Sequence, residues 1–225
     1  MILFVFLTLF SCSFSLAAEL KPFEAKYSIS RNDKKTGEQI TRLTQLDDNL
    51  WKIEDQIIGT NGLASVIGFN RTETTEFTEI DGQYHAIRHN MKQKAAFSKK
   101  QYKFTWNEST QNFDIIHKGT QVTYSPQNAH LISAQMMPIA LSKAACRQQQ
   151  NLNLSVLKHK KPKTYRFSIQ QQTQKITAHR LYDAGVKKTT ETWFDETKNC
   201  LPSKQIHKDH DEPVIKTQLI EFTWL

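Results

Sequence analysis

The sequence predicts an all-β, mainly antiparallel fold, a sandwich or barrel of roughly ten strands with one short kinked helix. Three observations support this. Apolar residues recur with a period of two, not 3.6, along most of the chain. Polar turn segments separate the alternating runs at intervals of about ten residues. A single segment, residues 129–146, has a helical composition.

The alternating runs place apolar side chains on one face of each expected strand. Asp81-Gly82 is typical of a tight hairpin turn between two of these strands. The last run, residues 214–224, is long and becomes apolar on both faces near its end. The clearest inward-facing sets are Phe23, Ala25, Tyr27 and Ile29; Trp51, Ile53 and Ile57; Tyr102, Phe104 and Trp106; Phe113 and Ile115; and Tyr165, Phe167 and Ile169.

Two segments depart from strand patterning. Residues 59–70 (GTNGLASVIGFN) form an apolar island bounded by glycine, which indicates a loop or a short helix. Residues 129–146 (AHLISAQMMPIALSKAAC) are apolar nearly all round, and Pro138 is expected to break or kink the helix there.

Residues 1–18 (MILFVFLTLFSCSFSLAA) contain no charged side chain, and their apolar run followed by small residues is typical of a secretory signal peptide. Cys12 offers the alternative of a lipid-modified cysteine, although Phe10 fits a lipobox poorly. Residues 19–225 would then be a single soluble domain without a transmembrane segment, in the periplasm or outside the cell.

Two cysteines remain in that domain, Cys146 and Cys200. In an oxidising compartment an even pair favours a disulfide. Two separate buried thiols are the alternative, because sequence does not fix the distance between them.

The charge is distributed unevenly. The net charge is +8, but residues 82–182 contain 16 basic and only 2 acidic residues. If neighbouring strands pair, this region forms a basic wall that attracts anions such as lipid head groups or lipopolysaccharide, or it is simply a solvated face. Export argues against nucleic acid as a partner. The wall comprises Arg88, Lys92, Lys94, Lys99, Lys100, Lys103, Lys158, Lys160, Lys161, Lys163 and Arg166.

The sequence contains no recognisable catalytic, cofactor-binding or metal-binding motif. The carboxylates lie among polar or turn residues, so no buried acid–base pair is expected, and no enzyme activity is predicted. His85 and His89 are interpreted as surface residues, with a metal site as the alternative. A metal site at His207, Asp209 and His210 is a second alternative to ordinary turn residues.

Four stretches together resemble one bacterial secreted family. They are PFEAKYSI after the leader, NRTETTEF, LISAQMMPIAL in mid-chain, and the closing TETWFDETKNCLPSKQIHKDHDEPVIKTQLIEF. In this order they are similar to the family catalogued as domain of unknown function 3108, over essentially all of residues 19–225. The resemblance implies a periplasmic curved sheet or open, incomplete β-barrel, with no established catalytic residues. The lysine-rich middle and the cysteine pair depart from that family's usual pattern.

Two functions follow as hypotheses. The first is a periplasmic, non-enzymatic binding or carrier module for a lipid-like or anionic envelope ligand, with an apolar cavity inside the sheet. Its lids would be the glycine-bounded island and the proline-containing helix, contributing Leu63, Val66, Ile67, Phe69, Met136, Met137 and Pro138. The alternative is a structural or assembly factor that binds another envelope protein or the cell wall.

Overall fold

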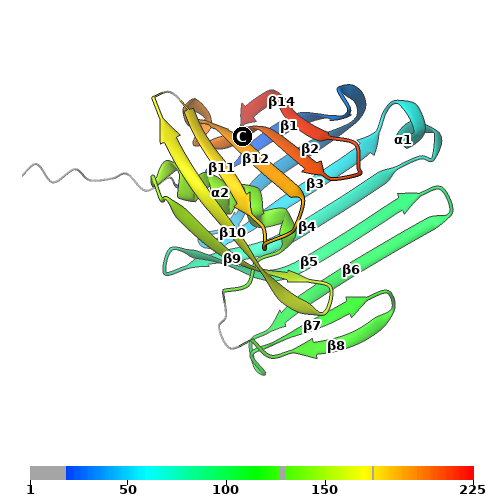
Figure 1. The fold of residues 1–225 in the computed structure, drawn as a ribbon. Helices are drawn as coiled ribbons and strands as arrows, with labels where there is room; N and C mark the ends of the chain where they lie inside the picture. The colour runs from blue at the N-terminus through cyan, green and yellow to red at the C-terminus, as the bar shows by residue number, and fades with distance from the viewer. Residues whose placement is uncertain (1–18, 127–129, 174) are drawn as a thin grey trace, which may run out of the picture.

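The computed structural model describes residues 19–126, 130–173 and 175–225. Within these residues, fourteen strands form one antiparallel sheet (Figure 1). The predicted fold class is confirmed, but the predicted number of strands was too low. The strands are β1 (Phe23–Arg31), β2 (Lys34–Asp47), β3 (Leu50–Gly59), β4 (Asn70–Ile80), β5 (Gln83–Ala95), β6 (Ser98–Asn107), β7 (Asn112–His117), β8 (Thr120–Tyr124), β9 (Asn151–Lys158), β10 (Lys161–Gln172), β11 (Lys175–Leu181), β12 (Lys188–Asp195), β13 (Leu201–Asp209) and β14 (Ile215–Trp224).

The sheet curls into an open barrel. Its strand order runs from β8 through β1 and β14 to β9, so the pairing of β1 with β14 joins the two halves. The strands β8 and β9 at the two ends do not pair with each other. A short segment spans part of the gap: the Leu131 carbonyl accepts from Ala86 N of β5 at 2.9 Å, and the Ile132 carbonyl accepts from Leu157 N of β9 at 2.9 Å. Strands β6–β8 extend beyond this seam as a wing (Figure 1).

A short helix lies inside the curl. The 3₁₀ turn η1 (Ala134–Met136) leads into α2 (Met137–Cys146), where Pro138 occupies the first turn. Of the two predicted effects of Pro138, the kink is wrong, whereas the α-helix does begin beside the proline, at Met137. Proline is tolerated there because a first-turn residue needs no backbone N–H partner within the helix. The side chains from Ile139 to Ala145 are buried, and Lys143 forms an ion pair with Glu79 at 2.6 Å. A disulfide joins Cys146 to Cys200, as the sequence predicted.

The core follows from strand alternation. Phe77, Phe104 and Phe113 are fully buried on the concave face, together with side chains of α2. Asp81 and Gly82 adopt φ values of 51° and 75° in the β4–β5 turn, which confirms the predicted hairpin. The apolar island contains the one-turn helix α1 (Gly62–Val66).

In the part of the chain that is described, no helix is both long and apolar enough to cross a membrane. The predicted signal peptide and Cys12 lie outside the described residues.

Candidate functional site

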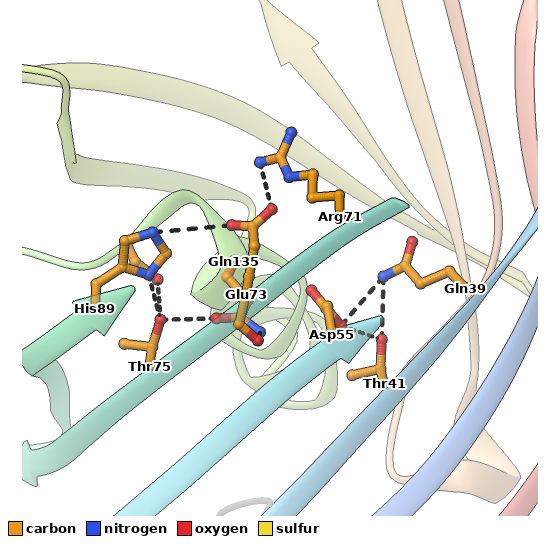
Figure 2. A network of polar contacts seen from close by, with 9 residues as sticks. Gln39, Thr41, Asp55, Arg71, Glu73, Thr75, His89 and Gln135 are labelled. Carbon is orange, nitrogen blue, oxygen red and sulfur yellow. Dashed lines mark hydrogen bonds and ion pairs between the residues drawn. The ribbon is translucent and has the colours of Figure 1, made fainter. Parts of the chain in front are cut away.

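A row of polar side chains crosses the concave face of the sheet, where an apolar core would be expected (Figure 2). Strand register creates the row: Thr41 of β2 lies opposite Asp55 of β3, and Asp55 lies opposite Glu73 of β4. One residue pair along, Thr75 of β4 lies opposite His89 of β5. Residues directly opposite each other on one face of a sheet are close enough to interact.

Asp55 is half-buried and accepts two hydrogen bonds from side chains of β2. Thr41 Oγ1 donates to Asp55 Oδ1, and Gln39 Nε2 donates to the same oxygen at 3.3 Å. Burial, together with the charge of the neighbouring Glu73 carboxylate, raises the pKa of Asp55 to about 6, against the opposing effect of these hydrogen bonds. Asp55 therefore titrates close to neutral pH.

The Thr75 hydroxyl is the centre of a buried network. It donates to Gln135 Oε1 at 2.8 Å, while Gln135 Nε2 donates to the backbone carbonyl of Glu73 at 3.1 Å. Because the hydroxyl has one proton, its contacts with Ser133 Oγ at 2.9 Å and His89 Nδ1 at 2.8 Å must be accepted bonds. The assignment places the ring proton of His89 on Nδ1 and leaves Nε2 as an acceptor.

Glu73 and His89 face each other in this buried region. Burial raises the pKa of Glu73, and the adjacent Arg71 guanidinium, with which Glu73 forms an ion pair, opposes that shift. Burial, assisted by the charge of Arg71, lowers the pKa of His89 to about 3. His89 is thus uncharged at neutral pH, and its Nε2, at 3.9 Å from Glu73 Oε2, forms no ion pair with the carboxylate.

Unfilled space adjoins the row. A cavity of about 350 Å³ lies between the two halves of the sheet. It is lined by Asp55, Arg71 and Glu73 from one half, Arg180 and His207 from the other, and Gln135 and Pro138 at the start of α2. A smaller cavity of about 110 Å³ shares Asp55, Gln135 and Pro138 and reaches Tyr27.

A third cavity, of about 420 Å³, lies beside α1 and is almost entirely apolar. Its lining includes Ile29, Ile67 and Phe69, and it shares Ile57 with the polar cavity. The concave face therefore offers a polar compartment and an apolar compartment on either side of one isoleucine.

The structure distributes the predicted basic wall over two regions. Most of the basic residues on β5 and β6 alternate with the buried side chains and face the convex side; these are Arg88, Lys92, Lys94, Lys99 and Lys103. Lys100 is in phase with the concave side. The residues of β9, β10 and their turn, Lys158, Lys160, Lys161, Lys163 and Arg166, lie at the other end of the strand order. The two regions approach each other where Tyr102 of β6 donates to the Leu157 carbonyl of β9 at 3.3 Å. Nearby, the ring of His117, at the end of β7, is 4.5 Å from that of His159 in the β9–β10 turn.

The proposed lid residues have different surroundings. Leu63, Ile67 and Phe69 line the apolar cavity, and Met137 and Pro138 line the polar one. Met136 is fully buried in the core, whereas Val66 is 83% exposed.

The two histidine-based interpretations change. His85 and His89 are buried, not on the surface, because their rings pack against Trp106 and Phe104, each with a centroid distance of 5.1 Å. Across residues 19–126, 130–173 and 175–225, no three His, Cys, Asp or Glu side chains come together as metal ligands would. His207 contacts Thr190 Oγ1 at 2.7 Å, and His210 contacts Asp211.

The expectation of no buried carboxylate pair was wrong, because the buried Glu73 lies directly opposite the half-buried Asp55. The signal that identifies them is phase. Asp55 falls between Ile53 and Ile57 in an inward-facing series, and Glu73 and Thr75 are in phase with Phe77. A charged residue at an inward-facing position of a strand indicates a site rather than a solvated strand end.

The raised pKa of Asp55 leads to a first prediction. A carboxyl group whose folded-state pKa exceeds its unfolded value, about 3.9, costs stability as pH rises between the two values. The variant Asp55→Asn retains an acceptor for Thr41 and Gln39 but carries no charge. We expect it to be more stable than the wild type by about 1–2 kcal/mol above pH 7 and indistinguishable from it below pH 4. Urea unfolding across this pH range measures the difference in free energy of unfolding between the variant and the wild type. Asp47→Asn, at an exposed position, serves as the control. Equal effects of the two variants at all pH values would contradict the prediction.

The fold, though not the sequence, is similar to a known structure. A crystallised protein from Brucella abortus, described as a β-barrel-like protein of domain of unknown function DUF1849, matches with a TM-score of 0.61 over 92% of this chain and 99% of that one, at 10% identity. No protein-family model and no curated protein matches the sequence. The resemblance to domain of unknown function 3108 therefore stays a prediction, and the structural comparison identifies a β-barrel-like fold alone.

Proposed function

We propose that the protein is a non-enzymatic binding module of the cell envelope that carries a lipid-like ligand with an anionic head group inside its curled sheet. The observation that supports this is the pairing of two unfilled compartments on the concave face, one polar and one apolar, which meet at Ile57. Ligand sites are typically concave and mostly apolar, with a few polar groups that converge on one end of the ligand.

The apolar compartment suits an aliphatic chain. Its lining is dominated by isoleucine, leucine and phenylalanine side chains, and Arg31 and Thr36 are its polar side chains. A polar ligand would therefore find few partners there to replace its hydration. Each methylene group transferred from water into such a site contributes about 0.8 kcal/mol.

The polar compartment suits an anionic head group. The Arg180 guanidinium lies 4.2 Å from the Tyr165 ring centroid and 4.4 Å from that of Tyr182, and within the described residues it has no acidic partner. Stacking on aromatic rings holds a guanidinium in place while its N–H groups stay available for a carboxylate or phosphate. In Arg71, which lines the same cavity, Nε is shielded from solvent and has no hydrogen-bond partner among the described residues.

The carboxylates of the row support binding more than catalysis. Glu73 is already paired with Arg71, and Asp55 accepts from Thr41 and Gln39. Below about pH 6, a protonated Asp55 gains a donor that a ligand hydroxyl or carbonyl can use. The proposed compartment of the cell is supported by the disulfide, because such bonds persist in oxidising environments.

Blocking the junction between the compartments tests the proposal. In Ile57→Trp, the indole would occupy space that the polar and apolar cavities share, so we expect co-purifying lipid to fall at least tenfold, which corresponds to about 1.4 kcal/mol. Native mass spectrometry of protein purified from its own envelope gives the measurement. Gln56→Trp, on the exposed face of the same strand, is the matched control. If the wild type carries no lipid from that source, or if both variants carry as much as the wild type, the proposal is wrong.

A second candidate function, assembly with another envelope protein, is favoured by one observation. Among the described residues, strand β8 pairs only with β7, so its outer edge offers backbone groups to a strand of a partner. Photo-crosslinking from residue 121 or 123 in cells would capture that partner. The absence of any crosslinked species at both positions would exclude this mode of binding.

A further inference from the structure

Two chain reversals lie side by side at one end of the molecule, away from the core. One is α1 with the residues that follow it, and the other is the turn between β5 and β6 (Figure 1). Ala96 N donates to the Ile67 carbonyl at 2.6 Å, which fixes the two reversals to each other. We refer to residues 62–68 and 94–100 together as the tip.

The tip presents apolar side chains to solvent. Phe97 is 105% exposed, Val66 83% and Leu63 73%, whereas the side chains of α1 contribute nothing to the buried core. Single exposed apolar residues are ordinary, but three large ones on two joined turns form a patch that is typical of an interaction surface.

The patch is flanked by unpaired cations. Lys94 of β5 lies opposite Lys99 of β6, and Lys100 follows. Opposed like charges on neighbouring strands are destabilising, so this arrangement is costly in isolation. Lys92, Lys94, Lys99, Lys100 and Lys118 line one surface groove of about 770 Å³ that contains no acidic side chain. None of these five lysines forms an ion pair with any residue that the structure describes.

An anionic bilayer surface matches this combination better than a soluble polyanion does. A soluble polyanion would engage the lysines but would leave Phe97, Val66 and Leu63 in water. At a membrane interface, lysine ammonium groups contact phosphates while neighbouring aromatic and aliphatic side chains enter the acyl boundary. The acidic turn that contains Asp209, Asp211 and Glu212 joins β13 to β14. In the sheet order, strands β1–β4 lie between β14 and β5, so this turn is not a neighbour of the lysines on β5.

We propose that the tip docks the protein on an anionic lipid bilayer, with Leu63, Val66 and Phe97 inserted in the interface and Lys94, Lys99 and Lys100 bound to lipid phosphates. The apolar cavity lies directly beside it, since Leu63 and Ile67 belong to both the tip and the cavity wall. Docking does not require that the cavity carry a ligand, and the two proposals can fail independently.

Vesicle co-sedimentation of the purified protein tests the docking. Vesicles of phosphatidylglycerol mixed with phosphatidylcholine should bind the protein, and vesicles of phosphatidylcholine alone should bind it much more weakly. We expect Phe97→Ser to weaken binding to the anionic vesicles at least tenfold, and Lys94→Gln/Lys99→Gln to weaken it comparably and to flatten its dependence on salt. All three positions are exposed, so thermal unfolding should be unchanged.

Matched controls remove similar groups elsewhere. Ile220→Ser deletes an exposed apolar side chain on β14, and Lys208→Gln/Lys216→Gln deletes two charges of β13 and β14; both variants should bind vesicles as the wild type does. Ile57→Trp should also bind vesicles normally, which separates docking from ligand loading. Equal losses of vesicle binding in the tip variants and the control variants would overturn the proposal. So would unchanged vesicle binding by Phe97→Ser, if the protein also binds the soluble polyanion dextran sulfate as tightly as it binds the vesicles.

Discussion

Loss of the Cys146–Cys200 disulfide is expected to lower the free energy of unfolding by about 4 kcal/mol, the largest effect of any change considered. The bond joins residues 54 apart, and a crosslink of that span removes many conformations from the unfolded chain. The enclosed segment contains β9–β12, one end of the strand order, and the bond attaches it to the end of the buried helix α2.

The variant Cys146→Ala/Cys200→Ala isolates this effect, because it keeps a β-carbon at both positions and leaves no thiol behind. Guanidinium unfolding should give this variant the same free energy of unfolding as the reduced wild type. Dithiothreitol should not change the value for the variant. The wild-type thiols should resist alkylation until the protein is reduced. A difference of less than 1 kcal/mol between oxidised and reduced wild type would show that the crosslink does not stabilise the fold. Alkylation without reduction would show that the bond is not formed.

The strand pattern could be predicted from the sequence because alternation is a local property. The inward-facing set of β1, from Phe23 to Ile29, was assigned correctly. The number of strands was underestimated where turns contain no glycine. Asn32 and Asp33 reverse the chain between β1 and β2 with φ values of 47° and 60°, and Ala96 does so between β5 and β6 at 49°. A left-handed conformation is uncommon for alanine, so composition did not indicate the turn at Ala96, whereas Asn and Asp adopt this conformation more readily.

The candidate site was missed for a different reason. Asp55, Glu73 and Gln135 come from β3, β4 and η1, and the contact between Gln135 and β4 spans 62 residues. Only the curl of the sheet and the insertion of α2 bring them together. A carboxylate in a strand is also interpreted by default as solvent-facing, since most are. The basic residues were recognised from composition, but their division between the convex and concave faces depends on register and bulges, which a single sequence does not reveal.

Removal of Arg71 is expected to destabilise the protein by about 3 kcal/mol at neutral pH. In Arg71→Leu, the Glu73 side chain, which is 7% exposed, would lose the cation that compensates its burial. Breaking a buried ion pair in this way costs about 3–5 kcal/mol, and we expect the lower end because the Arg71 side chain is itself 33% exposed. For comparison, Arg42→Leu removes an exposed partner of Glu24, and its effect should stay below about 1 kcal/mol.

The pH dependence distinguishes a lost charge pair from lost packing. Burial already raises the pKa of Glu73, and without Arg71 the effect of burial is unopposed, so the folded-state pKa would lie further above the unfolded value of about 4.3. A carboxyl group raised in this way destabilises the fold increasingly as pH rises from the unfolded pKa toward the folded one. The deficit of Arg71→Leu should therefore be small near pH 4 and complete at neutral pH. The double variant Arg71→Leu/Glu73→Gln, in which no buried charge is left, should recover most of the stability at pH 7. Two results would contradict this explanation: a loss of stability in Arg71→Leu that is the same at pH 4 and pH 7, or a double variant that is no more stable than Arg71→Leu. Either result would mean that Arg71 stabilises the fold through packing and not through its charge pair with Glu73.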